Sequence, residues 1–327
     1  MKIIALLPVK NEAWILPTFI SSVEPIVDKI IAIDDGSTDD SKKILKNAGA
    51  LVIDNPFSTR RGWAEYKIRQ KLLDLGREHG GTHFICIDAD EALTTPFLTE
   101  GKKLLSAMSP GDRYSLTWLS LWKNKSKYRD DESVWGNLHK HVIFCDDGIT
   151  NFINPENVDY NTDSGQRPHL VGPTPVVTGK KVKKIPLESG ALLHYQFVNW
   201  DRFQWKQVHK RCLELIQRPS DARRINNTYR ITLDSPAKCS DIPPQWVEHI
   251  QQPQNIVTEL WQKNEVCNWL DDYGYEFFEP LQMWHITELN INFIKNMGRR
   301  PQSKTYPNWL IQLNGLRHRV KRNLEKN

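Results

Sequence analysis

The sequence predicts an α/β protein with a doubly wound, mostly parallel central sheet and helices on both of its faces. Short apolar runs alternate with helical patterns from the N-terminus to residue 93, and this alternation is typical of parallel strands joined by helices. Polar clusters follow three of the runs, at 8–12, 34–40 and 88–91. Ligands of doubly wound sheets bind beyond the carboxyl ends of the strands, so we expect these clusters to open on one crevice.

Four buried strands and three helices are expected in this first part of the chain. Short continuous apolar runs between turn signals are typical of strands that are buried on both faces. Apolar residues at helical spacing fill the intervals between the runs, and prolines or glycines end each helix. The expected strands are 3–7, 29–33, 51–53 and 84–87.

The following part of the chain is expected to complete the domain with longer loops. Its expected elements are a helix after Pro96, strands over 114–122, 142–144 and 191–195, and a helix from 199 to about 218. Residues 123–132 are predicted as a charged loop and 151–175 as a long irregular loop, and long loops in compact domains are often functional lids. We therefore expect one domain over residues 1–218 and an irregular, mainly helical extension over 219–327.

Composition places the chain among soluble globular proteins. Of its 327 residues, 39% are hydrophobic and 25% are charged, which is ordinary for that class. The five cysteines are far apart and form no CxxC, so we expect neither a disulfide framework nor a zinc site, and a reducing compartment, the cytoplasm. No apolar run reaches the length of a transmembrane helix. The twelve tryptophans are either a rigid lining for sugar rings or core filling.

The net charge of +5 is modest, and much of it lies in the C-terminal tail. Five arginines and lysines of the segment 317–326 face a single glutamate there. This tail is either a solvated end or a contact for anionic lipid at the inner face of a membrane. The sequence has no long basic surface of the kind that dedicated nucleic-acid binders carry, so no nucleic-acid partner is expected.

The stretch 84–93 is the centre of the predicted site. Three carboxylates, Asp88, Asp90 and Glu91, directly follow its buried run. Like charges at close range repel one another, and burial penalises each of them. A divalent cation offsets both costs, and oxygen ligands of this kind suit Mg²⁺ or Mn²⁺. The alternative is an acidic loop that caps the helix starting near Pro96.

Three motifs follow the expected strands in a fixed order. They are Pro8-Val-Lys-Asn-Glu12, Ile33-Asp-Asp-Gly-Ser-Thr-Asp39 and Ile87-Asp-Ala-Asp-Glu91. Together they resemble the family 2 glycosyltransferases, which have the GT-A fold, and the resemblance covers roughly residues 1–215. It implies a nucleotide-sugar donor in the crevice and Mn²⁺ or Mg²⁺ on the donor's diphosphate, where the metal stabilises the charge that develops on the leaving group.

The resemblance also implies which residues contact the donor. The loop after the first strand and the first Asp of the second motif would hold the base, and a helix cation would lie near the nucleotide. Asp88 would meet the ribose or a metal-bound water. Arg60 and Arg61 are further cationic candidates. The implied donor site comprises Pro8, Lys10, Glu12, Asp34, Arg69, Asp88, Ala89 and Asp90.

Metal ligands and a catalytic base follow from the same resemblance. Asp90 would bind the metal, and His194, at the end of an expected strand, would be a second ligand; the alternative is a structural histidine. Family 2 members are usually inverting, so a carboxylate must deprotonate the acceptor hydroxyl. By position the candidates are Asp131, which we prefer, and then Asp130, Glu132 and Asp146.

The reaction that the resemblance implies is transfer of a single sugar. A Glu-Asp pair followed by a QxxRW stretch, familiar from processive members, is absent from the sequence. The acceptor stays open between a glycan, a lipid-linked glycan and another hydroxyl compound. The expected partners are therefore a nucleotide-sugar donor and an acceptor of one of these classes.

Three other classes of protein share single features with this sequence. A haloacid-dehalogenase-like phosphatase also carries Asp-x-Asp after a buried strand, but Ala92 stands where that class has a threonine. A dinucleotide-binding oxidoreductase would need GxGxxG after the first strand, and residues 8–13 contain no glycine. A non-catalytic carbohydrate-binding protein would suit the many tryptophans but would not need a metal site at three strand ends.

Overall fold

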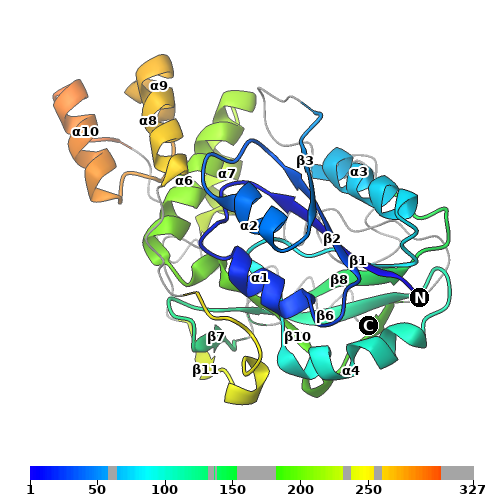
Figure 1. Cartoon of the computed structure of the whole chain (residues 1–327). Helices are drawn as coiled ribbons and strands as arrows, with labels where there is room; N and C mark the ends of the chain where they lie inside the picture. Colours follow the sequence, from blue (N-terminus) through cyan, green and yellow to red (C-terminus); the bar gives the residue numbers. More distant parts are fainter. Residues whose placement is uncertain are drawn as a thin grey trace, which may run out of the picture. The chain divides into compact units, whose positions relative to one another are not determined.

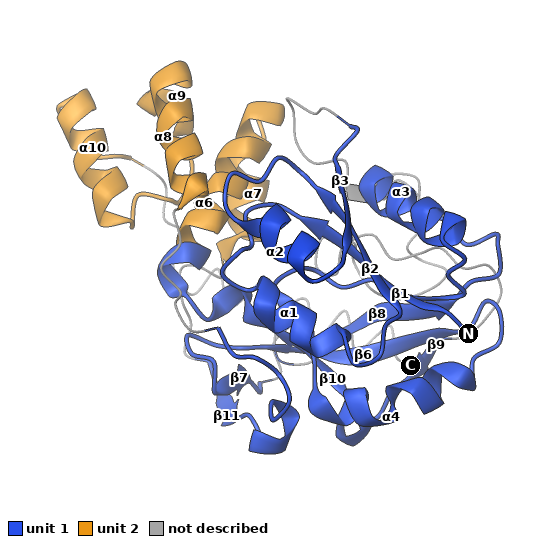
Figure 2. Ribbon diagram, in the orientation of Figure 1, with its two compact units in different colours: residues 1–203, 236–259 blue, residues 204–235, 260–327 orange. Residues whose placement is uncertain are grey.

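The computed structural model describes residues 1–57, 65–131, 136, 138–152, 182–230, 237–253 and 260–302. The chain forms two compact units (Figure 2), residues 1–203 with 236–259 and residues 204–235 with 260–327. The expected boundary after residue 218 falls inside the second unit, because α6 (Trp200–Gln217) begins in the first unit and continues into the second. Arg60, Arg61, Glu132, most of the long loop 151–175 and the basic tail lie outside the described residues.

A mixed α/β architecture with a mostly parallel sheet is confirmed for the first unit (Figure 1). Within the described ranges, nine strands form one sheet in the order β3-β2-β1-β4-β8-β6-β10-β5, with β9 paired to β6. Five of its eight pairings are parallel. The strands are β1 (Ile3–Val9), β2 (Lys29–Asp34), β3 (Leu51–Asp54), β4 (His83–Ile85), β5 (Glu91–Leu93), β6 (Arg113–Ser120), β8 (Leu138–Cys145), β9 (Val182–Lys184) and β10 (Ala191–His194).

Strand β1 is longer than predicted, because Pro8 lies within it rather than ending it. Pro8 pairs with Ile33 of the parallel neighbour β2. Proline has no N–H to donate to a second neighbour. On the other side, however, β4 pairs only with residues 3–5 of β1, so the sheet loses no ladder bond at Pro8.

Helices cover both faces of the sheet, as predicted. Successive residues of a strand point to opposite faces, and β1 divides accordingly between two hydrophobic clusters. Leu7 packs in one cluster with residues of α1 (Leu16–Val23), α2 (Ser41–Asn47) and α4 (Thr95–Ser106). Leu6 packs in the other with residues of α3 (Glu65–Glu78).

One prediction of local structure is wrong, and one strand was not predicted. Residues 91–93, in the acidic stretch after β4, form β5 and pair with β10. The charged loop 123–132 contains β7 (Lys127–Arg129), which pairs with β11 (Cys239–Asp241) in a small second sheet. Both pairings join segments about a hundred residues apart, which local sequence patterns do not reveal.

The second unit contains helices, as expected for the C-terminal part of the chain. Its hydrophobic cluster includes Val208, Leu270 and Phe293, which are buried. No described helix is both long enough and apolar enough to span a bilayer. Besides the end of α6, the described helices are α7 (Ala222–Thr228), α8 (Trp261–Tyr273), α9 (Tyr275–Phe278) and α10 (Thr287–Met297).

Candidate active site

Polar side chains collect at one edge of the large sheet, which we call the carboxyl edge. Strands β1, β2 and β4 are parallel neighbours, so their carboxyl ends all lie there. Strands β6 and β10 run in the same direction, because antiparallel β8 separates β4 from β6. The three polar clusters of the sequence therefore follow strand ends on one side of the sheet, together with the ends of β6 and β10 and the start of β8.

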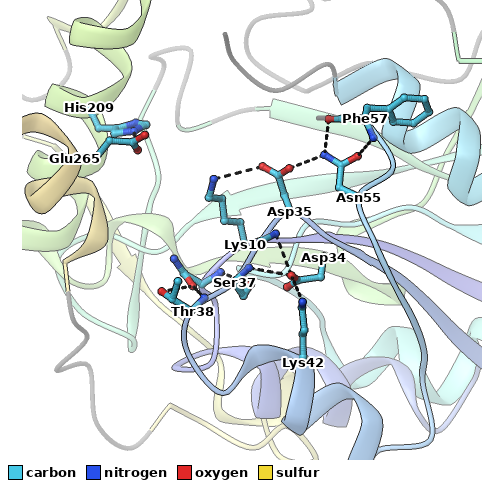
Figure 3. Close-up of polar contacts among 12 residues, drawn as sticks. Lys10, Asp34, Asp35, Ser37, Thr38, Lys42, Asn55, Phe57, His209 and Glu265 are labelled. Carbon is cyan, nitrogen blue, oxygen red and sulfur yellow. Dashed lines mark hydrogen bonds and ion pairs between the residues drawn. The ribbon is translucent and has the colours of Figure 1, made fainter. Parts of the chain in front are cut away.

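Asp34, at the end of β2, presents a buried oxygen at this edge (Figure 3). Its Oδ2 accepts the backbone N–H groups of Gly36, over 3.0 Å, and Ser37, over 2.9 Å. Gly36 has a φ of 78°, which glycine adopts without strain. Lys42 Nζ lies 3.4 Å from the same oxygen. The other oxygen, Oδ1, is buried and has no hydrogen-bond partner in the described structure, so it can accept a donor from a ligand.

The loop after β1 is tied to the loop after β2. Asn11 has a φ of 52°, a region that is strained for a residue with a side chain. Its side-chain Oδ1 accepts the N–H of Thr38 over 2.7 Å, while its own N–H donates to Ser37 Oγ over 2.8 Å. Lys10 Nζ lies 3.5 Å from Asp35 (Figure 3). These contacts hold the first two polar clusters together.

Asp88 lies in a network of four charged side chains, which we call the Asp88 network. Arg69 Nη2 donates to Asp88 Oδ1 over 2.5 Å, and Lys140 Nζ donates to Oδ2 over 2.7 Å. Lys140 also donates to both oxygens of Glu91, over 2.7 and 2.8 Å. Two cations thus offset two carboxylates, so Asp88 and Glu91 are compensated without a metal ion.

The pKa values of the two carboxyl groups move in opposite directions. Burial raises the pKa of Asp88, but Lys140 and Arg69 outweigh burial and hold that pKa well below its usual range. Burial raises the pKa of Glu91 to about 7, although Lys140 acts to lower it. The Glu91 side chain is fully buried, whereas that of Asp88 is 36% exposed. Asp88 is therefore the anionic, accessible member of the network.

Asp90 and His194 meet because β5 and β10 are antiparallel partners, with His194 opposite Glu91. The backbone N–H of Tyr195 donates to the Asp90 carbonyl oxygen over 2.8 Å. His194 Nε2 lies 3.8 Å from Asp90 Oδ1, and both side chains are buried. The indole of Trp118 stacks on the His194 ring, with 4.4 Å between the ring centres. The two residues predicted to share a metal are therefore neighbours.

The spacing of Asp90 and His194 fits a shared divalent cation. Carboxylate and imidazole ligands lie about 2.1 Å from such an ion, so two of them are roughly 3 to 4 Å apart. The pair combines the oxygen ligand that Mg²⁺ and Mn²⁺ favour with a softer nitrogen ligand. In the described ranges no group of three or more His, Cys, Asp or Glu could hold a metal. Substrate oxygens and water would have to complete the coordination.

Asp131 is linked to the carboxyl edge by two contacts, its own with Arg129 and that of Arg129 with Trp122. Arg129 Nε donates to Asp131 Oδ2 over 2.7 Å, and its guanidinium lies 4.5 Å from the centre of the Trp122 ring. Trp122 follows the end of β6, and its backbone N–H donates to the Lys127 carbonyl over 2.9 Å. Asp130 is more exposed and accepts the hydroxyl of Ser240 over 2.6 Å.

The topology of the sheet excludes Asp146 as a candidate for the catalytic base. Asp146 follows β8, which runs antiparallel to β4, so it lies at the opposite edge of the sheet. There both of its oxygens accept hydrogen bonds from Arg77, over 2.8 and 2.7 Å. Asp146 is therefore not a candidate base.

Two cations of the carboxyl edge were missed by the sequence prediction, Lys140 and Arg202. Lys140 stands between two histidines at the start of an apolar run, and an isolated charge in a buried strand is a signal that it has a partner. Arg202 donates to Glu12 over 2.7 Å. Its position in the first turn of an expected helix carries no comparable signal.

Comparison with known proteins supports the resemblance to glycosyltransferases. No protein-family model matches the chain. Over 131 residues the chain is 31% identical to an uncharacterized glycosyltransferase of Rickettsia felis, a match that covers 39% of this chain and 43% of that protein. The chain thus spans less than half the length of this curated relative. The predicted resemblance to glycosyltransferases is confirmed to this extent.

Solved structures resemble parts of the chain at low identity. One is glucosyl-3-phosphoglycerate synthase from Mycobacterium tuberculosis in complex with Mg²⁺ and uridine diphosphate, 24% identical, which covers 36% of this chain and 43% of that one with a TM-score of 0.28. Another is TarS 1-349 of S. aureus, 12% identical, which covers 71% of each chain with a TM-score of 0.37. Both TM-scores lie below 0.5.

Proposed function

We propose that this chain is a metal-dependent glycosyltransferase that moves a single sugar from a nucleotide-sugar donor to a hydroxyl acceptor. One observation carries the proposal: the pairing of β5 with β10 places His194 Nε2 3.8 Å from Asp90 Oδ1. This potential metal site lies at the carboxyl edge, where Asp34 and Asp88 also lie. The similarity to a glycosyltransferase over 131 residues supports the same reading.

The donor nucleotide fits the edge between β2 and β4. The unpartnered Oδ1 of Asp34 can accept an N–H of the base. Pro8, Lys10 and Glu12 would line the base from the loop after β1. The exposed carboxylate of Asp88 would accept a ribose hydroxyl or a metal-bound water, with Arg69 holding it in place and Ala89 beside it.

Asp90 and His194 would hold the metal, Mn²⁺ or Mg²⁺. When bound there, the ion supplies charge stabilisation for the departing diphosphate without any proton transfer. The protein's own part is to keep both ligands buried and fixed. The stacking of Trp118 on His194 and the backbone bond from Tyr195 to Asp90 do so.

For the acceptor we propose direct displacement with inversion, with Asp131 as the base. The acceptor hydroxyl passes its proton to the Asp131 carboxylate while its oxygen bonds to the anomeric carbon and the nucleoside diphosphate leaves. Arg129, bonded to Asp131 over 2.7 Å, fixes the carboxylate. A glycan, a lipid-linked glycan or another hydroxyl compound can each serve as the acceptor, because each carries the hydroxyl group that this step requires.

Replacing Asp131 by Asn is expected to slow transfer about a hundredfold or more, because the amide cannot take the acceptor proton. Donor binding should not change. Initial rates and donor affinity of Asp131→Asn are compared with those of Asp130→Asn, the matched change one residue earlier. If Asp130→Asn were slow and Asp131→Asn as fast as the wild type, the base would be Asp130 instead.

A thermal-shift panel tests the proposed function. It combines UDP, GDP, dTDP and CMP each with Mn²⁺, with Mg²⁺ and with EDTA. A ligand that binds the native state raises the melting temperature by mass action, so one nucleotide should stabilise the protein only when metal is present. Stabilisation by simple sugars but by no nucleotide would point to a non-catalytic carbohydrate-binding protein and contradict the proposal.

We also propose the cytoplasm as the compartment. All five cysteines lie within the described residues and are free, which a reducing compartment maintains. Cells are lysed under acid quench, and a thiol reagent added in denaturant at neutral pH should then label all five, because the thiolate is the reactive form. Protection of a pair of cysteines until a reductant is added would count against this compartment.

A further inference from the structure

A buried arginine joins the start of α6 to the loop after β1. Arg202 Nη2 donates to Glu12 Oε2 over 2.7 Å, and its guanidinium lies 4.7 Å from the centre of the Trp14 ring. The indole N–H of Trp14 donates to the same Glu12 oxygen, also over 2.7 Å. The Arg202 side chain is 3% exposed and that of Glu12 is 12% exposed. We call these three residues the Arg202 clamp.

The Arg202 clamp connects both halves of the proposed site. On one side, the N–H of Glu12 donates to Ser41 Oγ over 2.9 Å, which ties the clamp to the segment after Asp34. On the other side, the backbone N–H of Arg202 donates to Oδ1 of Asn199 over 3.0 Å, and Asn199 lies shortly after the end of β10 at His194. The clamp therefore joins the loop after β1 to the segment that follows β10.

The hydrogen bonding of the Arg202 guanidinium is incomplete. Its second terminal nitrogen, Nη1, is buried without a hydrogen-bond partner in the described structure. A buried donor left unsatisfied is destabilising, and apolar residues of similar volume often replace a buried ion pair without loss of stability. An unsatisfied buried group in a native protein calls for an explanation, and a functional role is one.

We propose that Arg202 is a positioning residue for the nucleoside half of the donor and that it acts through Glu12. The guanidinium fixes the carboxylate of Glu12 with a charge-assisted hydrogen bond. The inference rests on the proposed function, because it takes Glu12 as a residue of the donor site.

Calorimetric titration of the full chain tests this role. The probes are UMP and UDP, or the corresponding pair for the base that the thermal-shift panel identifies, with and without Mn²⁺. The variants are Arg202→Met, Arg202→Lys, Glu12→Gln and the double variant Glu12→Gln/Arg202→Met. Arg224→Met is the matched control, because Arg224 forms an exposed ion pair with Glu214 in the second unit.

Arg202→Met should weaken monophosphate and diphosphate binding alike, by about tenfold, because the clamp acts on the nucleoside half. Arg202→Lys should recover part of this loss, and Arg224→Met should bind like the wild type. The double variant should bind no more weakly than the weaker single variant, because two residues that act as one unit are not additive.

Two results would overturn the inference while the wild type still binds nucleotide. One is a lowered melting temperature for Arg202→Met and Arg202→Lys with unchanged nucleotide affinity, which shows a purely structural role. The other is additivity in the double variant, which shows that Arg202 does not act through Glu12. A wild type that binds none of the nucleotides would overturn the proposed function itself.

Discussion

Replacing Asp90 by Asn is expected to reduce glycosyl transfer by about a thousandfold while the fold survives. The amide keeps the size of the side chain but loses the anionic oxygen that lies 3.8 Å from His194 Nε2. The backbone N–H of Tyr195 donates to the backbone carbonyl of residue 90, and this bond remains in the variant. The thermal-shift panel identifies the nucleotide of the donor. The rate of transfer is then measured as release of that nucleotide from its sugar donor.

Glu100→Gln is the control for Asp90→Asn, because it removes one carboxylate from an exposed position of α4. This variant should transfer sugar at the wild-type rate. Circular dichroism and melting temperature show that both variants are folded. Full activity of a folded Asp90→Asn would remove the metal site from the proposed mechanism.

Replacing Lys140 by Met should cost about 3 to 5 kcal/mol of unfolding free energy, the largest effect on stability that we expect. Lys140 bonds both oxygens of Glu91 and one of Asp88. The Glu91 side chain is fully buried, so removal of the ammonium group leaves a buried carboxylate without its cation. Urea unfolding followed by tryptophan fluorescence measures the loss.

The loss in Lys140→Met should grow as the pH rises. The folded-state pKa of Glu91 is already raised from its usual 4.5 to about 7. Ionisation of Glu91 therefore opposes folding as the pH rises from the lower of these values to the higher. Without Lys140 the opposition is stronger, and the variant should be less destabilised at pH 5.5 than at pH 8. The double variant Lys140→Met/Glu91→Gln should recover at least half of the lost free energy at pH 8. Strict additivity of the two changes would show that the Asp88 network is not a coupled unit.

The first three strands and their helices were predictable from local pattern. Apolar runs, the glycine at 36 and the proline at 25 mark where each element begins and ends, and the parallel arrangement then brings Asp34 and Asp88 to the same edge. The register between distant segments was not predictable, because neither β5 nor β7 has enough apolar residues to be recognised alone. Each forms by pairing with a strand about a hundred residues away.

The candidate site was likewise predictable only in part, because part of it depends on contacts between distant segments. Asp90 and His194 were paired by resemblance to a family, and their proximity depends on the register of β5 with β10. Lys140 escaped prediction because its partners lie 49 and 52 residues away in the sequence. Five of the nine tryptophans in the described residues favour the simpler interpretation, core filling, because they are buried: Trp118, Trp122, Trp205, Trp246 and Trp284. Trp118 nevertheless also stacks on His194.

Metal-dependent nucleotide binding by the wild type and by Asp90→Asn is the measurement that tests the central claim most directly. Each of UDP, GDP, dTDP and CMP is titrated into both proteins in a calorimeter, with Mn²⁺ and again with EDTA. We predict that one nucleotide binds the wild type with Mn²⁺, that EDTA weakens this binding at least tenfold, and that Asp90→Asn binds equally weakly in both conditions. Binding that is as tight in EDTA as in Mn²⁺, or that survives unchanged in Asp90→Asn, would contradict a donor site built around a metal at Asp90.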